Sequence, residues 1–154
     1  MATKCTVFSV GDADLDEVVD QPDTSLPRYE DLTSRIAVTA QTPMLELGVN
    51  WQPLHFAFGD HAAVHPLGFL AAGGEAVPAL DDGEHSSGRY FAPARVKEIL
   101  DALQRTPDRD VASNLAASPT KLDAVDGLRL FDLLTEFLVD AAATNRGIVV
   151  HRFR

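Results

Sequence analysis

Four histidines lie close together in the middle of the sequence and could in principle hold a metal. They are His55, His61, His65 and His85, and imidazole is a common zinc ligand. His61 and His65 are four residues apart, as two ligands on one helical face would be. A glycine and a proline flank this pair, however, and the sequence has neither an HExxH nor a paired CxxC motif. Ordinary solvated histidines explain the cluster, so we predict no metal site.

A second group of residues would suit a small-ligand pocket. His55 shares an apolar helical stripe with Trp51, and a part-buried neutral histidine can act as a general base near neutral pH. A tryptophan can line a pocket and offer its N–H as a polar handle. A core position explains both residues as well. The candidate pocket consists of Trp51, His55, Gly73, Gly74, Arg89 and Tyr90.

Arg89 comes shortly before an expected helix that begins at Pro93. An arginine beside a helix N-terminus can bind a carboxylate or phosphate. Pro93 removes one of the N–H groups that would face such an anion, and the sequence has no phosphate-binding glycine motif. Arg89 could instead pair with a nearby acid, Asp81, Asp82 or Glu84.

The sequence gives little support for nucleophilic catalysis. Cys5 lies in an expected strand, where a buried and inert thiol is the default. Ser86 and Ser87 lack the glycine pattern of a nucleophile elbow. The acidic pairs, Asp81 with Asp82 and Asp108 with Asp110, are explained by solvated loop charges. We assign no catalytic residue and no cofactor.

These residues must be positioned by a small set of helices and strands. Apolar periodicity predicts helices over residues 51–58, 93–103 and 126–144 and a shorter one over 110–117. Strands are expected near both ends, at 3–10 and 148–153, and we expect them in the same sheet. Weaker signals suggest a helix at 15–19 and strands at 36–40 and 77–80. Residues 60–88 are rich in turn residues, and the apolar run 64–72 within them suits burial. We therefore predict an α+β protein with a single domain over residues 1–154 and a small mixed sheet.

Several of these motifs, in order, resemble the bacterial YfbM-like family (domain of unknown function 1877). They are the helix that starts Trp51-Gln52-Pro53, the Gly73-Gly74 pair, Gly88-Arg89-Tyr90-Phe91, and Phe137 with Ala141 before the last strand. The family usually has an acidic residue and a lysine shortly before the tryptophan, and here those positions hold Gly48 and Val49. The resemblance implies a mixed α+β domain and no established activity.

Composition and net charge disfavour some classes of binding partner and indicate a cellular compartment. The 154 residues carry 13 Lys+Arg against 23 Asp+Glu, a formal net charge of −10. This acidity disfavours binding to nucleic acid or anionic membrane. No segment reads as a membrane span or a signal peptide, and the single cysteine suits the reducing cytoplasm.

We expect a non-catalytic protein-interaction module that binds a basic protein partner, with neutralisation of a toxin by a small acidic immunity protein as one concrete form. The alternative is a small-ligand-binding protein or enzyme whose cleft contains Trp51, His55, Arg89 and Tyr90. Enzymatic activity stays open. An exposed edge strand or the apolar run 64–72 would suit a homo-oligomer, but a core role explains both.

Overall fold

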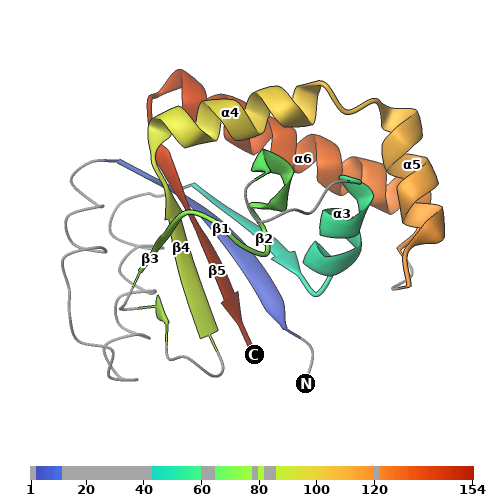
Figure 1. The fold of residues 1–154 in the computed structure, drawn as a ribbon, viewed down its shortest axis with the longest axis horizontal. Coiled ribbons are helices and arrows are strands. Elements are labelled where there is room, and N and C mark those ends of the chain that lie inside the picture. The colour runs from blue at the N-terminus through green and yellow to red at the C-terminus, as the bar shows by residue number, and fades with distance from the viewer. Residues whose placement is uncertain (1–2, 12–42, 60–64, 78–79, 82–85, 120–121) are drawn as a thin grey trace.

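The fold is built around a five-stranded sheet with both ends of the chain at its centre. The structure, a computed structural model, describes residues 3–11, 43–59, 65–77, 80–81, 86–119 and 122–154. The strand order is β2-β1-β5-β4-β3 (Figure 1). The strands are β1 (Lys4–Val10), β2 (Met44–Gly48), β3 (Glu75–Ala76), β4 (Ser86–Phe91) and β5 (Gly147–Phe153). β1 and β5 pair in register over their whole length, with Val7 opposite Val150.

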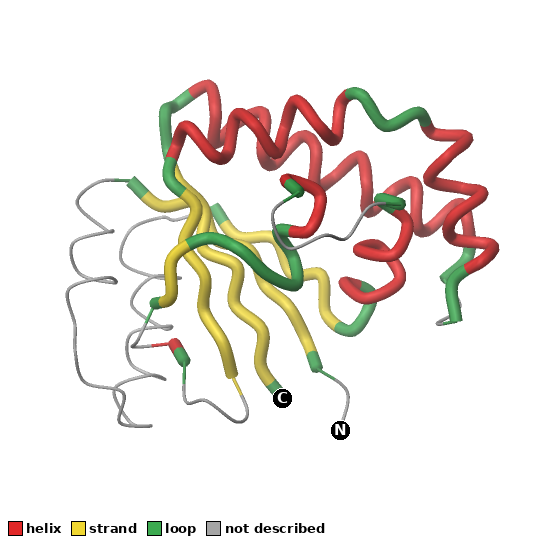
Figure 2. Tube along the Cα trace, in the orientation of Figure 1, coloured by secondary structure: helices red, strands yellow, loops and turns green. Residues whose placement is uncertain are grey.

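The helices form a layer against this sheet. They are α3 (Trp51–Ala57), the short 3-10 helix η1 (Pro66–Gly68), α4 (Pro93–Gln104), α5 (Asp108–Ala117) and α6 (Ala124–Ala143). Pro93 occupies the first turn of α4, where its missing N–H costs nothing, and Asp123 caps α6 by accepting from the Val125 N–H at 2.7 Å. Figure 2 shows the helices gathered toward one end of the strands, with the ends of the strands near both termini extending beyond them.

The two faces of the sheet bury different apolar clusters. Residues alternate between faces along a strand, so Cys5, Val7, Ile148 and Val150 join the helices in the main core. We call this the helix-side face. The alternate residues, among them Phe8, Tyr90 and Val149, form a second cluster on the opposite face.

The expected α+β fold with both terminal strands in one sheet is confirmed. The sheet is not mixed, because every pairing among the described strands is antiparallel. The strand expected over 77–80 is not found at Val77 or Leu80, since β3 is Glu75–Ala76, and residues 78 and 79 lie outside the described residues. The helix expected at 15–19 and the strand at 36–40 lie outside the described residues.

No strand is predicted from the sequence at β4, although β4 is next to β5 in the sheet. Its first half is Ser86-Ser87-Gly88, residue types with low strand propensity. Gly88 is nevertheless required, because a Cβ atom there would lie 2.5 Å from Cβ of Leu80. A close contact with the side chain of Leu80, rather than strand propensity, explains the glycine in this strand.

Candidate functional site

Trp51 lies at the boundary between α3 and the sheet. Its Nε1 donates to the Thr3 carbonyl at 2.8 Å, and its side chain is buried in the main core. The guanidinium of Arg152 lies over the indole, with Cζ 5.4 Å from the ring centroid. This is cation–π geometry. The tryptophan therefore links α3 to the residue before β1 by a hydrogen bond and makes a cation–π contact with Arg152.

His55 lies one helical turn after Trp51 and is half-buried. Its ring centroid is 6.4 Å from that of Trp51, and its Nδ1 atom is inaccessible to solvent. This position agrees with the expected place of His55 on the apolar stripe of α3, next to buried Leu54.

Gly73 and Gly74 make the turn into β3. Both have positive φ, 82° and 69°, which strongly favours glycine. At Gly74 a Cβ atom would lie 2.6 Å from the Tyr90 carbonyl oxygen and about 3 Å from the ring of Phe91. The pair therefore has a structural function, a close approach of the turn to β4.

Arg89 and Tyr90 project from opposite faces of the sheet. Arg89 is opposite Val150 in the register, which places it on the helix-side face, while Tyr90 is opposite Val149 and belongs to the second cluster. Arg89 lies within β4 rather than beside the first turn of α4, and no ion pair joins it to Asp81. The structure thus separates the two polar residues that the candidate pocket would need together.

Two titratable groups are buried in the central strands. Burial raises the pKa of the Cys5 thiol to about 12, although the positive charge of Arg152 acts in the opposite direction. Burial also lowers the pKa of His151 to about 4. Its ring stacks on that of Phe153 with centroids 4.8 Å apart. A protonated buried thiol and a neutral buried imidazole are typical of structural residues, and Cys5 agrees with the inert thiol expected from the sequence.

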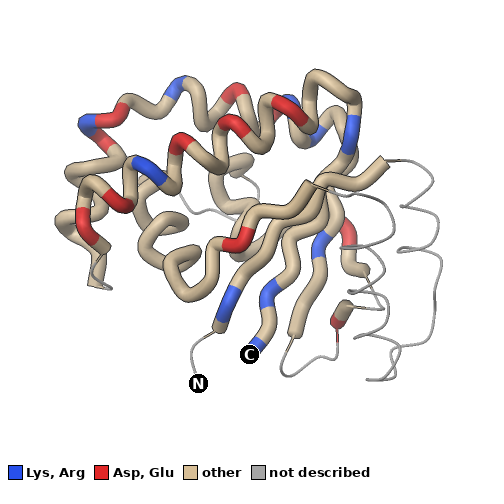
Figure 3. Tube along the Cα trace, turned by 180° about the vertical axis from the view of Figure 1, so that it is seen from behind, with Lys and Arg blue, Asp and Glu red and all other residues tan. Residues whose placement is uncertain are grey.

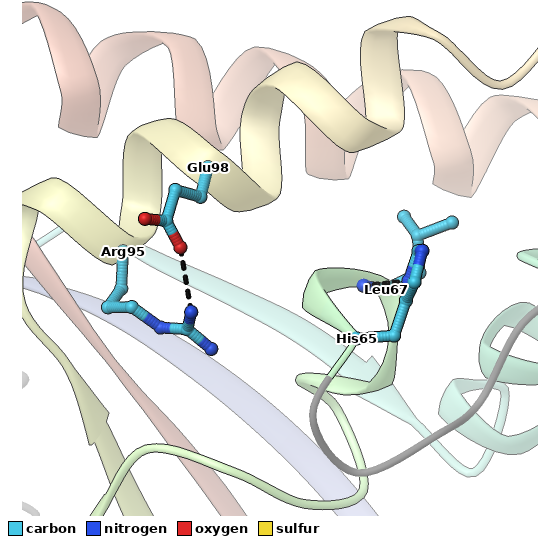
Figure 4. Close-up of polar contacts among 4 residues, drawn as sticks. All are labelled: His65, Leu67, Arg95 and Glu98. Atoms are coloured by element: carbon cyan, nitrogen blue, oxygen red, sulfur yellow. Dashed lines mark hydrogen bonds and ion pairs between the residues drawn. The ribbon is translucent and has the colours of Figure 1, made fainter.

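A groove of about 480 Å³ lies between η1 and α4, a site that the sequence analysis missed. His65 begins η1, and its Nδ1 accepts from the Leu67 N–H at 3.2 Å (Figure 4). The acids along the groove already have cationic partners. Arg95 pairs with Glu98 at 2.7 Å, and Arg105 pairs with Asp101. Both carboxylates of the groove, Glu98 and Asp101, are therefore paired with arginines, and neither is free for acid–base chemistry.

The described residues contain neither a cluster of metal-binding side chains nor a helix suited to crossing a membrane. No three His, Cys, Asp or Glu side chains gather there as a metal site would require. His61 and His85 lie outside the described residues, so the structure does not test whether the four histidines lie close together. None of the described helices has the length and apolar character needed to cross a membrane.

The outward surface of α6 carries acids and apolar side chains together. Asp132, Glu136 and Asp140 follow one another at four-residue spacing, which places them on one ridge of the helix. Leu133 and Val139 flank the ridge, each 40% exposed. We call these five residues the outer face of α6. The spacing of the acids is readable in the sequence, but their exposure depends on which stripe of α6 packs inward.

Charge is distributed unevenly over the molecule. Figure 3 shows acidic and basic residues interspersed over the helices, and basic residues on the central strands toward the two termini. Three arginines of the helical layer, Arg95, Arg105 and Arg109, each lie beside a carboxylate, whereas Lys97 and Arg129 make no ion pair with a described residue. The three acids of the outer face of α6 make no ion pair with any described residue.

Comparison with known proteins gives a family and a fold. The sequence model of DUF1877, described as a domain of unknown function, matches residues 1–151. The crystal structure of YfbM from Escherichia coli, a protein of unknown function, superposes with a TM-score of 0.65 at 11% identity, over 97% of this chain and 99% of that one. At that identity the likeness concerns the fold alone. No curated protein matches the sequence.

Proposed function

The chain belongs to the DUF1877 family, whose description gives no function, and we propose that it is a non-catalytic protein-interaction module. The partner is a basic protein, and the outer face of α6 binds it. The observation that carries the proposal is the row of three unpaired carboxylates, Asp132, Glu136 and Asp140, between two exposed apolar side chains.

This row of acids is unfavourable for the isolated helix. Like charges four residues apart on a helix destabilise it by about 0.2–0.5 kcal/mol per pair. Asp140 also lies in the last turn of α6, where the helix dipole disfavours an acid, and that turn has no basic residue. A basic partner would neutralise both effects, which supports a role of these acids in binding rather than in folding.

The apolar residues indicate the kind of partner surface. Leu133 and Val139 are accessible on either side of the acids, so a partner that buries them gains hydrophobic contact as well as charge complementarity. A basic amphipathic surface has this combination. Neutralisation of a basic toxin in the manner of a small immunity protein is one concrete form, by analogy of charge and size.

The proposal includes a place for the protein, the bacterial cytoplasm. The single cysteine, Cys5, is buried and reduced, which suits a reducing compartment. The net charge of −10 disfavours nucleic acid and anionic membrane as partners. The alternative, a ligand cleft at Trp51, His55, Arg89 and Tyr90, has less support because Arg89 and Tyr90 project from opposite faces of the sheet.

The test is affinity capture with a matched pair of variants. The tagged wild type, the α6 triple variant Asp132→Asn/Glu136→Gln/Asp140→Asn and a control triple variant Glu98→Gln/Asp101→Asn/Asp108→Asn are each incubated with native lysate at low and moderate salt. Both triple variants remove three negative charges. Captured proteins are identified by mass spectrometry, and binding is then reproduced with purified components.

We expect a basic protein at near-equal stoichiometry with the wild type and the control variant. Moderate salt and the α6 triple variant should both release it, because screening and charge removal weaken the same contact. Equal capture by both triple variants, or a partner whose capture is the same at low and moderate salt, would contradict the assignment to α6. A wild type recovered alone would contradict the interaction module itself.

A further inference from the structure

A second surface of the protein has the opposite charge. Arg152 of β5 is opposite Ser87 and Cys5 in the register, and Arg89 of β4 is opposite Val150. Cys5 and Val150 belong to the main core, so both arginines lie on the helix-side face. We call Ser87, Arg89 and Arg152 the basic surface of the sheet.

The two arginines are close enough to act together. Arg89 and Arg152 are diagonal neighbours on adjacent antiparallel strands, because Arg152 lies two residues beyond Val150, the partner of Arg89. Diagonal Cβ atoms of this kind are roughly 7–8 Å apart, within reach of long side chains. Ser87 is directly opposite Arg152 and adds a hydroxyl to the same surface.

Neither guanidinium is neutralised by the part of the chain that the structure describes. Arg89 makes no ion pair or hydrogen bond there, and the contact found for Arg152 is the one with the ring of Trp51. The described acids of the strands lie on the other face, since Glu46 is opposite Thr6 and Glu75 is opposite Tyr90.

This arrangement is unusual for so acidic a chain. The sequence has 23 acids for 13 Lys+Arg, so carboxylate partners are plentiful, and three helix arginines do lie beside one. Two like charges at neighbouring positions on one face of the sheet repel each other, and nothing in the described fold needs that repulsion. An anion between them would remove it.

We propose that the basic surface of the sheet binds a phosphate group. Two guanidinium groups and a hydroxyl supply hydrogen-bond donors, and no described carboxylate forms an ion pair with either arginine. A phosphate matches two cations in charge and can accept from both forks at once. The surface is distinct from the outer face of α6, so this inference is independent of the proposed protein partner.

Trp51 provides a direct readout of occupancy. It is the only tryptophan in the sequence, and the guanidinium of Arg152 covers its ring. A phosphate bound to Arg152 brings negative charge near the guanidinium that covers the Trp51 ring, and this changes the electric field at the indole. Titration with inorganic phosphate, at constant ionic strength maintained with chloride, should therefore change the tryptophan emission saturably.

The variants separate binding from folding. Arg89→Ala is the main test, because Arg89 makes no bond that the described fold depends on, and far-UV circular dichroism with a thermal melt checks that it is folded. We expect it to weaken phosphate binding about tenfold or more. Arg152→Ala is measured by titration calorimetry, since it also alters Trp51 itself. Arg109→Ala, an exposed arginine of α5, should bind phosphate as the wild type does.

Three results would overturn the proposal. They are a wild type with no saturable response to phosphate, an Arg89→Ala variant that is folded and binds phosphate unchanged, and acetate that binds as tightly as phosphate. Competition by sulfate, another tetrahedral oxyanion, is expected and would support the site.

Discussion

Arg146 binds Ser9 through two hydrogen bonds. Its Nε donates to the Ser9 Oγ at 3.0 Å, and its Nη2 donates to the Ser9 carbonyl at 2.9 Å. The two residues are 137 positions apart, one near the end of β1 and the other just before β5. The contact closes the central strand pair at the end of the sheet away from the termini.

Replacement of this arginine should therefore destabilise the fold. We expect Arg146→Ala to lower the free energy of unfolding by about 1–3 kcal/mol, because it leaves the buried Ser9 hydroxyl without a charged donor. Urea unfolding followed by circular dichroism measures the change. Arg109→Ala, whose side chain is 87% exposed, should change it by less than about 0.5 kcal/mol. Equal effects of the two variants would mean that the Ser9 contact contributes nothing.

His151 makes the stability of the fold depend on pH. Burial lowers its pKa from 6.5 to about 4 in the folded state, so the unfolded chain binds the proton more readily. Its contribution is complete above about pH 6.5 and is lost as the pH falls toward 4. The loss amounts to at most about 3 kcal/mol.

The measurement is urea unfolding at a series of pH values for the wild type and His151→Gln. The variant should show a shallower decline between pH 6.5 and 4. A decline of the same slope in both proteins would assign the acid sensitivity to other groups.

The backbone at Gly88 in β4 leaves no room for a side chain. A Cβ atom would meet Leu80 at 2.5 Å, so Gly88→Ala should destabilise the protein by about 1–3 kcal/mol through overpacking. Thermal unfolding measures it. Ser87→Ala, the neighbouring residue on the other face, should be close to neutral. A Gly88→Ala protein as stable as the wild type would show that Leu80 moves aside freely.

Asp140 should be replaceable with a gain in stability. Asp140→Asn removes a negative charge from the last turn of α6 and from the row with Glu136, so we expect about 0.3–1 kcal/mol of stabilisation. Asp126→Asn is the matched control, since Asp126 lies in the first turn, where an acid is favourable, and its loss should destabilise. Both are measured by thermal unfolding at low salt. Stabilisation by Asp126→Asn would contradict the electrostatic explanation.

Much of the fold was predictable because several elements carry a strong local pattern. The stripe of Trp51, Leu54 and Phe58 predicted α3, and the apolar run after Gly147 predicted β5. β4 was missed because its place in the sheet depends on pairing with β5, which is about 60 residues away along the chain and lies in no local window. Local periodicity reports how a segment is buried, whereas a partner distant in the sequence leaves no local signal.

The candidate site was less predictable for a related reason. The sequence placed Arg89 and Tyr90 together because they are adjacent, but adjacent strand residues point to opposite faces. Recognising β4 as a strand would have separated them, whereas placing Arg89 near Arg152 also requires the register of β4 with β5. Which residues share a face follows from strand register, and register depends on pairings between distant segments.

The pairing of β1 with β5 also sets an order of events during synthesis. β1 is synthesised long before β5, its partner in the sheet, so its apolar side chains Val7 and Phe8 lack that partner while the residues between the two strands are made. Two strands so far apart in the sequence pair slowly, as is typical of folds with many contacts between distant residues. The core can therefore be completed only once β5 has been made, and until then β1 is a segment that chaperones would need to protect.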